Sequence, residues 1–322
     1  MLRRQLGRTS IEVTELGFGA APIGNLHSAI TDEAAAATVQ AAWDGGIRYF
    51  DTAPHYGLGL SERRLGAALA GRPRESFVVS TKVGRLLVDN PAPTGSDLAA
   101  GGFDVPDSVI RERDYSADGV RRSLESSLIR LGLDRVDVVL VHDPEDFMDD
   151  ALNGAIPALV ELREQGVIGA VGAGMNFWPP LLRLVNESDV DVVMVAGRWT
   201  LADRSAAPML AACLDRNVSV LAAAPFNSGL LARPWPPDGA LFDYAPASPE
   251  LLHRARRLAK TCQRYDEQLP HAAMRFPLRH PAVASVVAGM RTDVHVRGNV
   301  DWAEHDLPGD LWKDLDAIVT AA

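Results

Sequence analysis

The chain has 322 residues, of which 47% are hydrophobic and 23% are charged. This composition supplies a large core and is too apolar for a disordered chain. Acidic side chains number 42 and basic ones 32, so a broad nucleic-acid-binding surface is not expected. Two cysteines cannot form a disulfide framework, and no apolar run has the length of a membrane span. We therefore expect a globular, cytoplasmic protein without nucleic-acid or membrane partners.

The first predicted element is a β-hairpin. The sequence RRQLGRTSIEVTEL contains two short β patterns on either side of a turn at Gly7, Arg8 and Thr9. If the strands that follow this hairpin close into a barrel, the hairpin would plug one end of that barrel.

Short β-branched runs and helical patterns then alternate along the chain. The strand runs are nearly all apolar, which is typical of parallel strands buried on both faces. They are Val13–Phe18, Tyr49–Asp51, Val78–Lys82, Val136–His142, Val167–Val171, Val190–Val195, Ser219–Ala223 and Val283–Ala288. Helical patterns cover Asp32–Asp44, Glu62–Ala70, Ala117–Arg130, Ala151–Gln165 and Pro249–Gln263. Eight strand–helix units predict a single (β/α)8 TIM barrel domain over residues 1–322, with a doubly wound open sheet as the alternative.

Two connections are longer than usual. Leu87–Asp114 follows the third strand and Asn227–Pro249 follows the seventh, and both are rich in proline or glycine. Long irregular segments in compact domains are usually functional. Both follow strand ends, so they are expected on the face where barrel enzymes carry their active sites.

Ionisable side chains end three neighbouring strands. Asp51, Lys82 and His142 occupy these ends, and Tyr56 follows in the motif DTAPHYG. Each alone has an ordinary structural explanation, such as a turn cap or a buried histidine. Together they supply both signs of charge, and buried charges need partners.

This set of residues permits proton transfer. A lysine ammonium beside a tyrosine favours the phenolate, so Lys82 is expected to lower the pKa of Tyr56 below its ordinary value of about 10. Asp51 would hold Lys82 charged and oriented, and His142 could donate a hydrogen bond to a substrate oxygen. Tyr56 could then exchange a proton with an alcohol or a carbonyl, which is the acid–base half of a hydride transfer.

The motifs FDTAPHYG, STK and LVHDP, at these separations, resemble those of the aldo-keto reductase superfamily. The resemblance covers essentially the whole chain, from LGRTSIEVTELGFG to AGMRTDVHVRGNV. It implies a (β/α)8 barrel and an NAD(P)-dependent oxidoreductase, with Asp51, Tyr56, Lys82 and His142 as the catalytic tetrad.

The resemblance also implies cofactor-binding residues. Asn176 corresponds to the residue that binds the nicotinamide carboxamide, and Trp199 stands where the family stacks an aromatic ring on the nicotinamide. Asn227, Gly229 and Leu230 resemble the pyrophosphate loop, in which backbone N–H groups meet phosphate oxygens.

At the adenosine end, Arg291 and Asn299 match the family pattern. Gly289 and His295 stand where many NADP-dependent members have basic side chains, but Arg291 could still bind a 2′-phosphate. We therefore expect NADP, with NAD as the alternative.

Loop sequences resemble the branch of the superfamily that contains L-fucose, D-threo-aldose 1- and pyridoxal dehydrogenases. This likeness implies oxidation of an aldose at C1 to a lactone. General aldehyde or ketone reduction is an alternative, as is a non-catalytic, cofactor-sensing role like that of channel β-subunits. His55, Arg198 and Trp178 are substrate-contact candidates.

No metal site is expected. The acidic run that begins at Asp143 has no paired histidines, so it is interpreted as a solvated helix entrance. The partner is a small carbonyl or sugar substrate, and the chain is expected to be a monomer.

Overall fold

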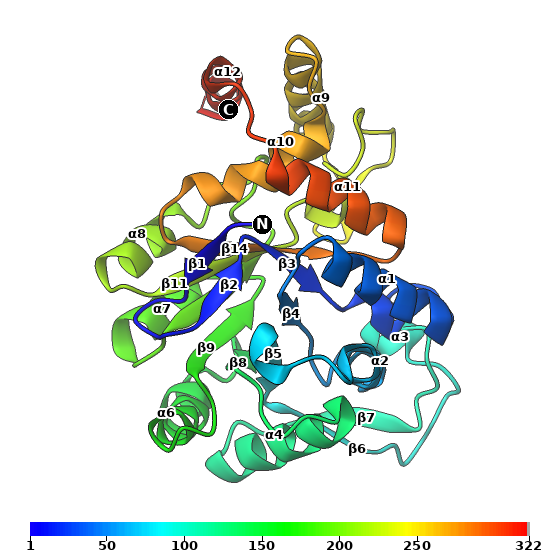
Figure 1. Ribbon diagram of the computed structural model, residues 1–322, viewed down its shortest axis with the longest axis vertical. Helices are drawn as coiled ribbons and strands as arrows, with labels where there is room; N and C mark the ends of the chain where they lie inside the picture. The colour runs from blue at the N-terminus through cyan, green and yellow to red at the C-terminus, as the bar shows by residue number, and fades with distance from the viewer. Residues whose placement is uncertain (321–322) are drawn as a thin grey trace.

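Eight parallel strands close into a barrel in the computed structural model, which describes residues 1–320 (Figure 1). Strand pairing follows chain order, and the last strand pairs with the first. The predicted (β/α)8 architecture is therefore confirmed. The barrel strands are β3 (Leu16–Gly19), β4 (Tyr49–Asp51), β5 (Val78–Val83), β8 (Val138–His142), β9 (Ala170–Met175), β10 (Val192–Ala196), β11 (Ser219–Ala223) and β14 (Val283–Gly289).

Helices surround the barrel, and hydroxyl side chains cap four of them. Thr31, Ser116, Ser248 and Thr292 each accept a hydrogen bond from the backbone N–H three residues further on. The helices that follow the barrel strands in turn are α1 (Asp32–Asp44), α2 (Leu60–Leu69), α4 (Ala117–Leu131), α6 (Ile156–Glu164), α7 (Trp178–Glu187), α8 (Ala207–Asp215), α10 (Leu269–Arg275) and α11 (Asp293–Glu304). Additional helices are α3 (Leu98–Gly101), α5 (Met148–Asp150), α9 (Pro249–Gln263) and α12 (Gly309–Thr320).

Alternate side chains of a barrel strand point to opposite faces, which explains the nearly continuous apolar runs. On β8, Val139 and Val141 belong to the layer between the barrel and the helices, whereas Val138 and Leu140 fill the barrel interior. All four side chains are fully buried. The interior is a packed core, so a binding site can form only at an end of the barrel.

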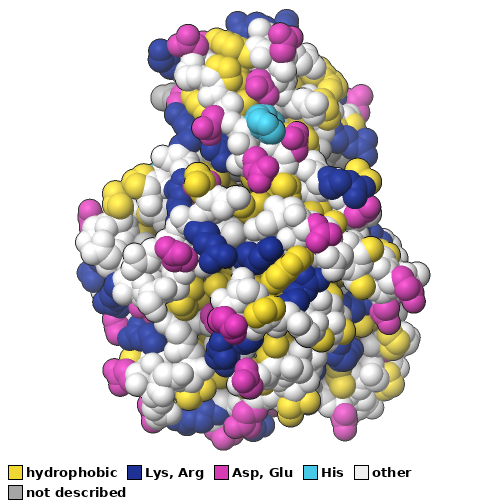
Figure 2. Space-filling model, viewed as in Figure 1, with side chains coloured by type: hydrophobic (Ala, Val, Ile, Leu, Met, Phe, Trp, Pro, Cys, Tyr) yellow, Lys and Arg dark blue, Asp and Glu magenta, His cyan; other side chains and the backbone are white. Residues whose placement is uncertain are grey.

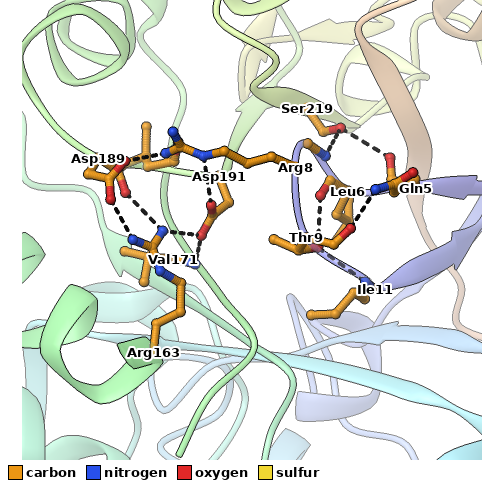
Figure 3. Close-up of polar contacts among 12 residues, drawn as sticks. Gln5, Leu6, Arg8, Thr9, Ile11, Arg163, Val171, Asp189, Asp191 and Ser219 are labelled. Carbon is orange, nitrogen blue, oxygen red and sulfur yellow. Dashed lines mark hydrogen bonds and ion pairs between the residues drawn. The ribbon is translucent and has the colours of Figure 1, made fainter. Parts of the chain in front are cut away.

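The amino-terminal hairpin packs across one end of the barrel (Figure 1), and Figure 3 shows its polar contacts. Its strands β1 (Arg3–Gln5) and β2 (Glu12–Thr14) pair antiparallel, as predicted. At its turn, Gly7 has a φ of +51°, and its N–H donates to Ser219 Oγ at 2.7 Å. A Cβ on Gly7 would lie 2.5 Å from the carbonyl oxygen of Asp191. Only glycine permits this approach of the hairpin to the amino-terminal ends of β10 and β11.

Asp191 links the hairpin to the barrel wall (Figure 3). Its carboxylate is 2% exposed and accepts hydrogen bonds from Arg163 Nη1 at 2.7 Å and from the N–H of Val171 at 2.9 Å. Its second oxygen lies 3.5 Å from Arg8 Nε. Asp189 contacts the same two arginines, but its side chain is 50% exposed.

Four predicted strands begin too early: those predicted to start at Val136 and Val190 start two residues later, and two others start three residues later. The first half of Val13–Phe18 belongs to the hairpin, and β3 begins at Leu16. Val167 is exposed and precedes β9, which starts three residues later. β9 contains small residues where large apolar ones would be expected. At Gly172 no side chain fits, because a Cβ there would lie 1.9 Å from the carbonyl oxygen of Val192.

Both long segments contain antiparallel hairpins, where the sequence predicted irregular structure. In the first, β6 (Arg85–Asp89) pairs with β7 (Val109–Arg113), and α3 lies between them. In the second, β12 (Leu241–Phe242) pairs with β13 (Ala245–Pro246). They follow β5 and β11, so they extend the carboxyl-terminal end of the barrel, away from the amino-terminal hairpin.

The surface that carries the amino-terminal hairpin has mixed charge. Figure 2 shows Lys and Arg side chains interspersed with Asp and Glu on this face. Among residues 1–320, none of the helices combines the length and hydrophobicity needed to span a bilayer.

The Asp191 contacts give a testable prediction for stability. Asp191→Ala leaves Arg163 and the N–H of Val171 without their buried acceptor, so we expect the free energy of unfolding to fall by about 3–5 kcal/mol. Asp189→Ala is the matched control, because this exposed carboxylate binds the same arginines and its loss should change stability by about 1 kcal/mol or less. Urea unfolding of both variants measures the difference. Equal losses would contradict the structural role assigned to Asp191.

Candidate active site

Lys82 lies at the centre of a buried polar cluster at the carboxyl-terminal end of the barrel. Its ammonium nitrogen lies 2.9 and 2.7 Å from the two carboxylate oxygens of Asp51 and 3.0 Å from the carbonyl oxygen of Thr52. It also donates to the hydroxyl oxygen of Tyr56 at 3.1 Å. Lys82 and Asp51 are each 2% exposed. Because a buried charge requires a partner, Asp51 holds Lys82 in place against Tyr56.

Two histidines complete the cluster. The His142 ring stands almost perpendicular to that of Tyr56, with ring centroids 5.9 Å apart. His55 packs against both rings, with its centroid 5.5 Å from that of His142 and 6.0 Å from that of Tyr56. The structure thus brings the four tetrad candidates together from the ends of β4, β5 and β8 and the turn after β4.

The cluster extends into the barrel through two residues that the sequence analysis missed. Ser80 Oγ donates to Asp51 Oδ1 at 2.7 Å, and the Tyr49 hydroxyl lies 3.0 Å from Ser80 Oγ. Both side chains are fully buried. The signal was present in the sequence, because Tyr49 and Ser80 each precede a tetrad residue by two positions and so share its face of the strand.

Burial dominates the proton affinity of Tyr56. It raises the pKa of Tyr56 to about 12, although the charge of Lys82 opposes the rise. The predicted lowering of the Tyr56 pKa is therefore wrong, because the loss of hydration outweighs the lysine. Burial by itself would lower the pKa of Lys82, but the carboxylate of Asp51 and the hydroxyl of Tyr56 raise it. The site therefore contains a protonated tyrosine beside a charged lysine at neutral pH.

Both histidines are neutral. Burial, together with the positive charges of Arg85 and Arg111, lowers the pKa of His55 to about 2. Burial and Arg85 likewise bring the pKa of His142 well below its ordinary value. A neutral imidazole has one N–H donor and one acceptor nitrogen, so His142 can still donate to a substrate oxygen.

A cavity of about 450 Å³ opens beside the cluster. Asp51, Tyr56, Lys82, His142 and His55 contribute to its lining. The two hairpin segments after β5 and β11 add walls to the cavity, on the barrel face where the sequence analysis expected them. The added residues include Gly101, Gly102, Phe103 and Tyr244, together with Asp143 at the end of β8.

Two of the predicted cofactor residues line this cavity. Asn176 follows β9 and Gly289 ends β14. Trp199 is not part of the lining, and its ring packs 5.4 Å from those of both Phe276 and His280. This placement does not favour the predicted stacking of Trp199 on a nicotinamide, which remains a prediction.

The predicted pyrophosphate loop is held by internal hydrogen bonds. The Asn227 side chain accepts from Thr200 Oγ1 at 2.6 Å and donates to the carbonyl oxygen of Gly197 at 2.9 Å. The N–H groups of Asn227, Gly229 and Leu230 all donate to backbone carbonyls three residues earlier. In this conformation, these N–H groups close the turn, and phosphate binding by them remains a prediction.

The two adenosine-end candidates lie near α11. Arg291 donates to the carbonyl oxygens of Leu26, Ser28 and Ala29, so its guanidinium ties the 26–29 loop to the end of β14. Asn299 is a buried residue of α11, 4% exposed. Their contacts with a cofactor remain predictions.

Of the three substrate candidates, only His55 lines the cavity. Arg198 binds Asp243 at 2.6 Å and lies 3.6 Å from Asp203, so it braces the β12–β13 hairpin. Trp178 begins α7 and packs against the core. Residues 1–320 contain no group of three or more His, Cys, Asp or Glu side chains that could hold a metal ion.

Residues 15–320 match the model of the aldo/keto reductase family. D-threo-aldose 1-dehydrogenase from Pseudomonas sp is 46% identical over 309 residues, covering 95% of this chain and 94% of that protein. Pyridoxal 4-dehydrogenase from Microbacterium luteolum is 40% identical, with coverage of 97% and 96%. The solved holo form of an aldo-keto reductase from Bacillus halodurans has a TM-score of 0.80 and 26% identity, and it covers 100% of this chain and 97% of its own.

The contact between Ser80 and Asp51 gives a prediction about positioning. Ser80→Ala removes a hydrogen bond to a buried carboxylate, so we expect kcat to fall about tenfold while KM stays within about twofold. Steady-state kinetics measures both constants.

Ser285→Ala is the matched control, because Ser285 is a fully buried serine on β14 whose hydroxyl lies 3.4 Å from the carbonyl oxygen of Glu15. It should leave kcat unchanged. If both variants lose the same activity, the effect is general loosening of the barrel core and not misplacement of Asp51.

Proposed function

Because the chain belongs to the aldo/keto reductase family, we propose that it oxidises the C1 hydroxyl of an aldose to a lactone, with NADP as the cofactor and NAD as the alternative. The observation that carries the chemistry is the 3.1 Å contact between Lys82 Nζ and the Tyr56 hydroxyl beside the cavity. The aldose assignment draws support from D-threo-aldose 1-dehydrogenase, at 46% identity over nearly the whole chain.

The residues of the cavity fit a nicotinamide ring. The cavity lining includes small residues, among them Gly19, Gly174 and Ala196, which leave room for a flat group. Asn176 adds a side-chain amide that can pair with a carboxamide. When bound, the oxidised cofactor supplies the hydride acceptor.

Tyr56 and His142 would orient the substrate. A hydroxyl between them can donate its proton toward the oxygen of Tyr56 while it accepts a hydrogen bond from the His142 N–H. Lys82 stabilises the tyrosinate form of Tyr56 that accepts this proton, because its ammonium lies 3.1 Å from that oxygen. Asp51 balances the charge of Lys82 and keeps it directed at Tyr56.

The same residues act in reverse on a carbonyl substrate. Tyr56 then donates its proton to the forming alkoxide, and Lys82 stabilises the tyrosinate that remains. Reduction of aldehydes or ketones is thus the second candidate, and the protonated state of Tyr56 at neutral pH favours it.

The direct test is oxidation of an aldose panel and pyridoxal with NADP and, separately, NAD, followed by the absorbance of reduced cofactor. We expect sustained turnover with a free aldose. Tyr56→Phe should lower kcat by at least about a hundredfold with little change in cofactor affinity, because it removes only the proton-transferring hydroxyl.

Tyr265→Phe is the control, since the Tyr265 hydroxyl binds Asp314 in the carboxyl-terminal helical cluster. Consumption of reduced cofactor with simple aldehydes, but no aldose oxidation, would replace the aldose proposal with a general reductase.

The raised pKa of Tyr56 predicts different pH dependence in the two directions. A phenol with a pKa of about 12 stays protonated below about pH 10, so kcat/KM for reduction should be constant between about pH 6 and 10. The tyrosinate needed for oxidation increases with pH, so kcat/KM for oxidation should rise throughout this range. His55 and His142 add no inflection to either kcat/KM profile, since their pKa values lie below this pH range. A fall in the reduction rate centred between about pH 7 and 9 would show that Tyr56 titrates near neutrality.

A further inference from the structure

Asp143 follows His142 directly, and its side chain lines the same cavity as Tyr56 and His142. In the sequence it begins an acidic run that was interpreted as a solvated helix entrance. In the structure it is only partly exposed, with 23% of the side chain accessible. A carboxylate in a cavity beside the proton-transfer residues can contact a bound substrate.

The backbone holds Asp143 in an unusual conformation. Its φ is +44°, in the left-handed region that residues other than glycine, asparagine and aspartate rarely adopt. The Asp143 N–H donates to the carbonyl oxygen of Gly174 at 3.0 Å. The buried hydroxyl of Tyr115 donates to the carbonyl oxygens of both His142 and Asp143, at 2.8 and 2.9 Å. These bonds fix the backbone on both sides of Asp143, and the residue lies in the cavity lining.

Only one carboxylate oxygen of Asp143 is occupied. Oδ2 accepts a hydrogen bond from Arg85 Nη2 at 2.5 Å and lies 3.6 Å from His142 Nε2. Within residues 1–320, no hydrogen bond reaches Oδ1. Arg85 belongs to β6 and is 12% exposed, so it holds the carboxylate from the side of the first hairpin. One acceptor oxygen is therefore fixed in the cavity wall without a donor.

The distance to His142 indicates what this oxygen would bind. A reacting substrate oxygen hydrogen-bonded to His142 Nε2 lies about 2.9 Å from that nitrogen, so it is close to the Asp143 carboxylate. A carboxylate repels the negative charge that develops on a carbonyl oxygen during reduction, so it does not suit the reacting oxygen. The Asp143 carboxylate suits a neutral hydroxyl group on the carbon next to the reacting carbon. When the reacting oxygen is hydrogen-bonded to His142, this hydroxyl lies near the carboxylate and can donate a hydrogen bond to it.

We propose that Asp143 accepts a hydrogen bond from the hydroxyl on the carbon next to the reacting carbon, which is the C2 hydroxyl of an aldose. This inference rests on the proposed function and identifies α-hydroxy carbonyl compounds and their cyclic forms as the preferred substrate class. A substrate without this hydroxyl supplies no donor to Asp143 Oδ1 in the cavity, which lowers the stabilisation of its transition state.

The test compares two substrates that differ only in this hydroxyl. Lactaldehyde and propanal are reduced with the cofactor that the wild-type enzyme prefers, and kcat/KM is measured for each. Asp143→Gly removes the carboxylate and suits a positive φ, so the backbone should keep its conformation. We expect kcat/KM for lactaldehyde to fall by about 10- to 100-fold and that for propanal to change by less than about threefold.

Two further variants support the interpretation. Asp143→Asn also tolerates a positive φ and should give an intermediate loss for lactaldehyde, because its amide oxygen accepts without a charge. Asp146→Asn is the matched control, because this exposed carboxylate of the same loop does not line the cavity, and it should leave both rates unchanged. Thermal unfolding confirms that each variant is folded.

The outcomes separate this inference from the proposed function. Equal losses for both aldehydes would show that Asp143 acts by supporting His142 or Arg85, and unchanged rates would show no contact; either result overturns the inference. If the wild-type enzyme oxidises no aldose while Asp143→Gly still affects lactaldehyde selectively, the aldose proposal fails and the hydroxyl subsite stands.

Discussion

The buried ion pair between Lys82 and Asp51 is the interaction on which the rest of the site depends. Both side chains are 2% exposed, so neither charge is hydrated and each requires the other. Ser80 and Tyr49 continue this polar chain into the barrel interior and orient the carboxylate from below. Lys82 then has a fixed position for its contact with Tyr56. The chemistry at the cavity surface thus rests on a hydrogen-bonded chain that begins in the apolar core.

Closure of the barrel makes this arrangement possible. β4 and β5 pair in parallel, so their carboxyl ends lie side by side and Asp51 meets Lys82. The amino-terminal hairpin packs against the opposite end, where Gly7 and Asp191 allow the close approach. The interior between the two ends is filled with side chains such as Leu140 and Val138. The carboxyl-terminal end is therefore where the barrel has room for a ligand.

Burial has two opposing effects in this site. It strengthens the electrostatic contacts of Lys82, but it also raises the pKa of Tyr56 and keeps His55 and His142 neutral. The outcome is a protonated acid held beside a positive charge, with neutral hydrogen-bond donors next to it. The pKa of Tyr56 was predicted to be lowered because the sequence indicated the neighbouring charge of Lys82. The sequence does not show how much hydration Tyr56 loses on burial, and this loss has the larger effect on the pKa.

The sequence alone determined the barrel and the cluster of three strand-end residues, Asp51, Lys82 and His142, with Tyr56 in the turn after β4. Apolar runs of strand length with helices between them imply parallel strands, and in a closed parallel sheet the ends of successive strands must converge. Tertiary structure decided the rest, because it depends on contacts between distant residues. It placed Trp199 against Phe276 outside the cavity, engaged Arg291 with the 26–29 loop, and built two hairpins where the sequence showed only proline and glycine. It also placed Asp143 in the cavity lining, with a left-handed backbone whose carbonyl accepts a hydrogen bond from Tyr115, 28 residues earlier in the chain.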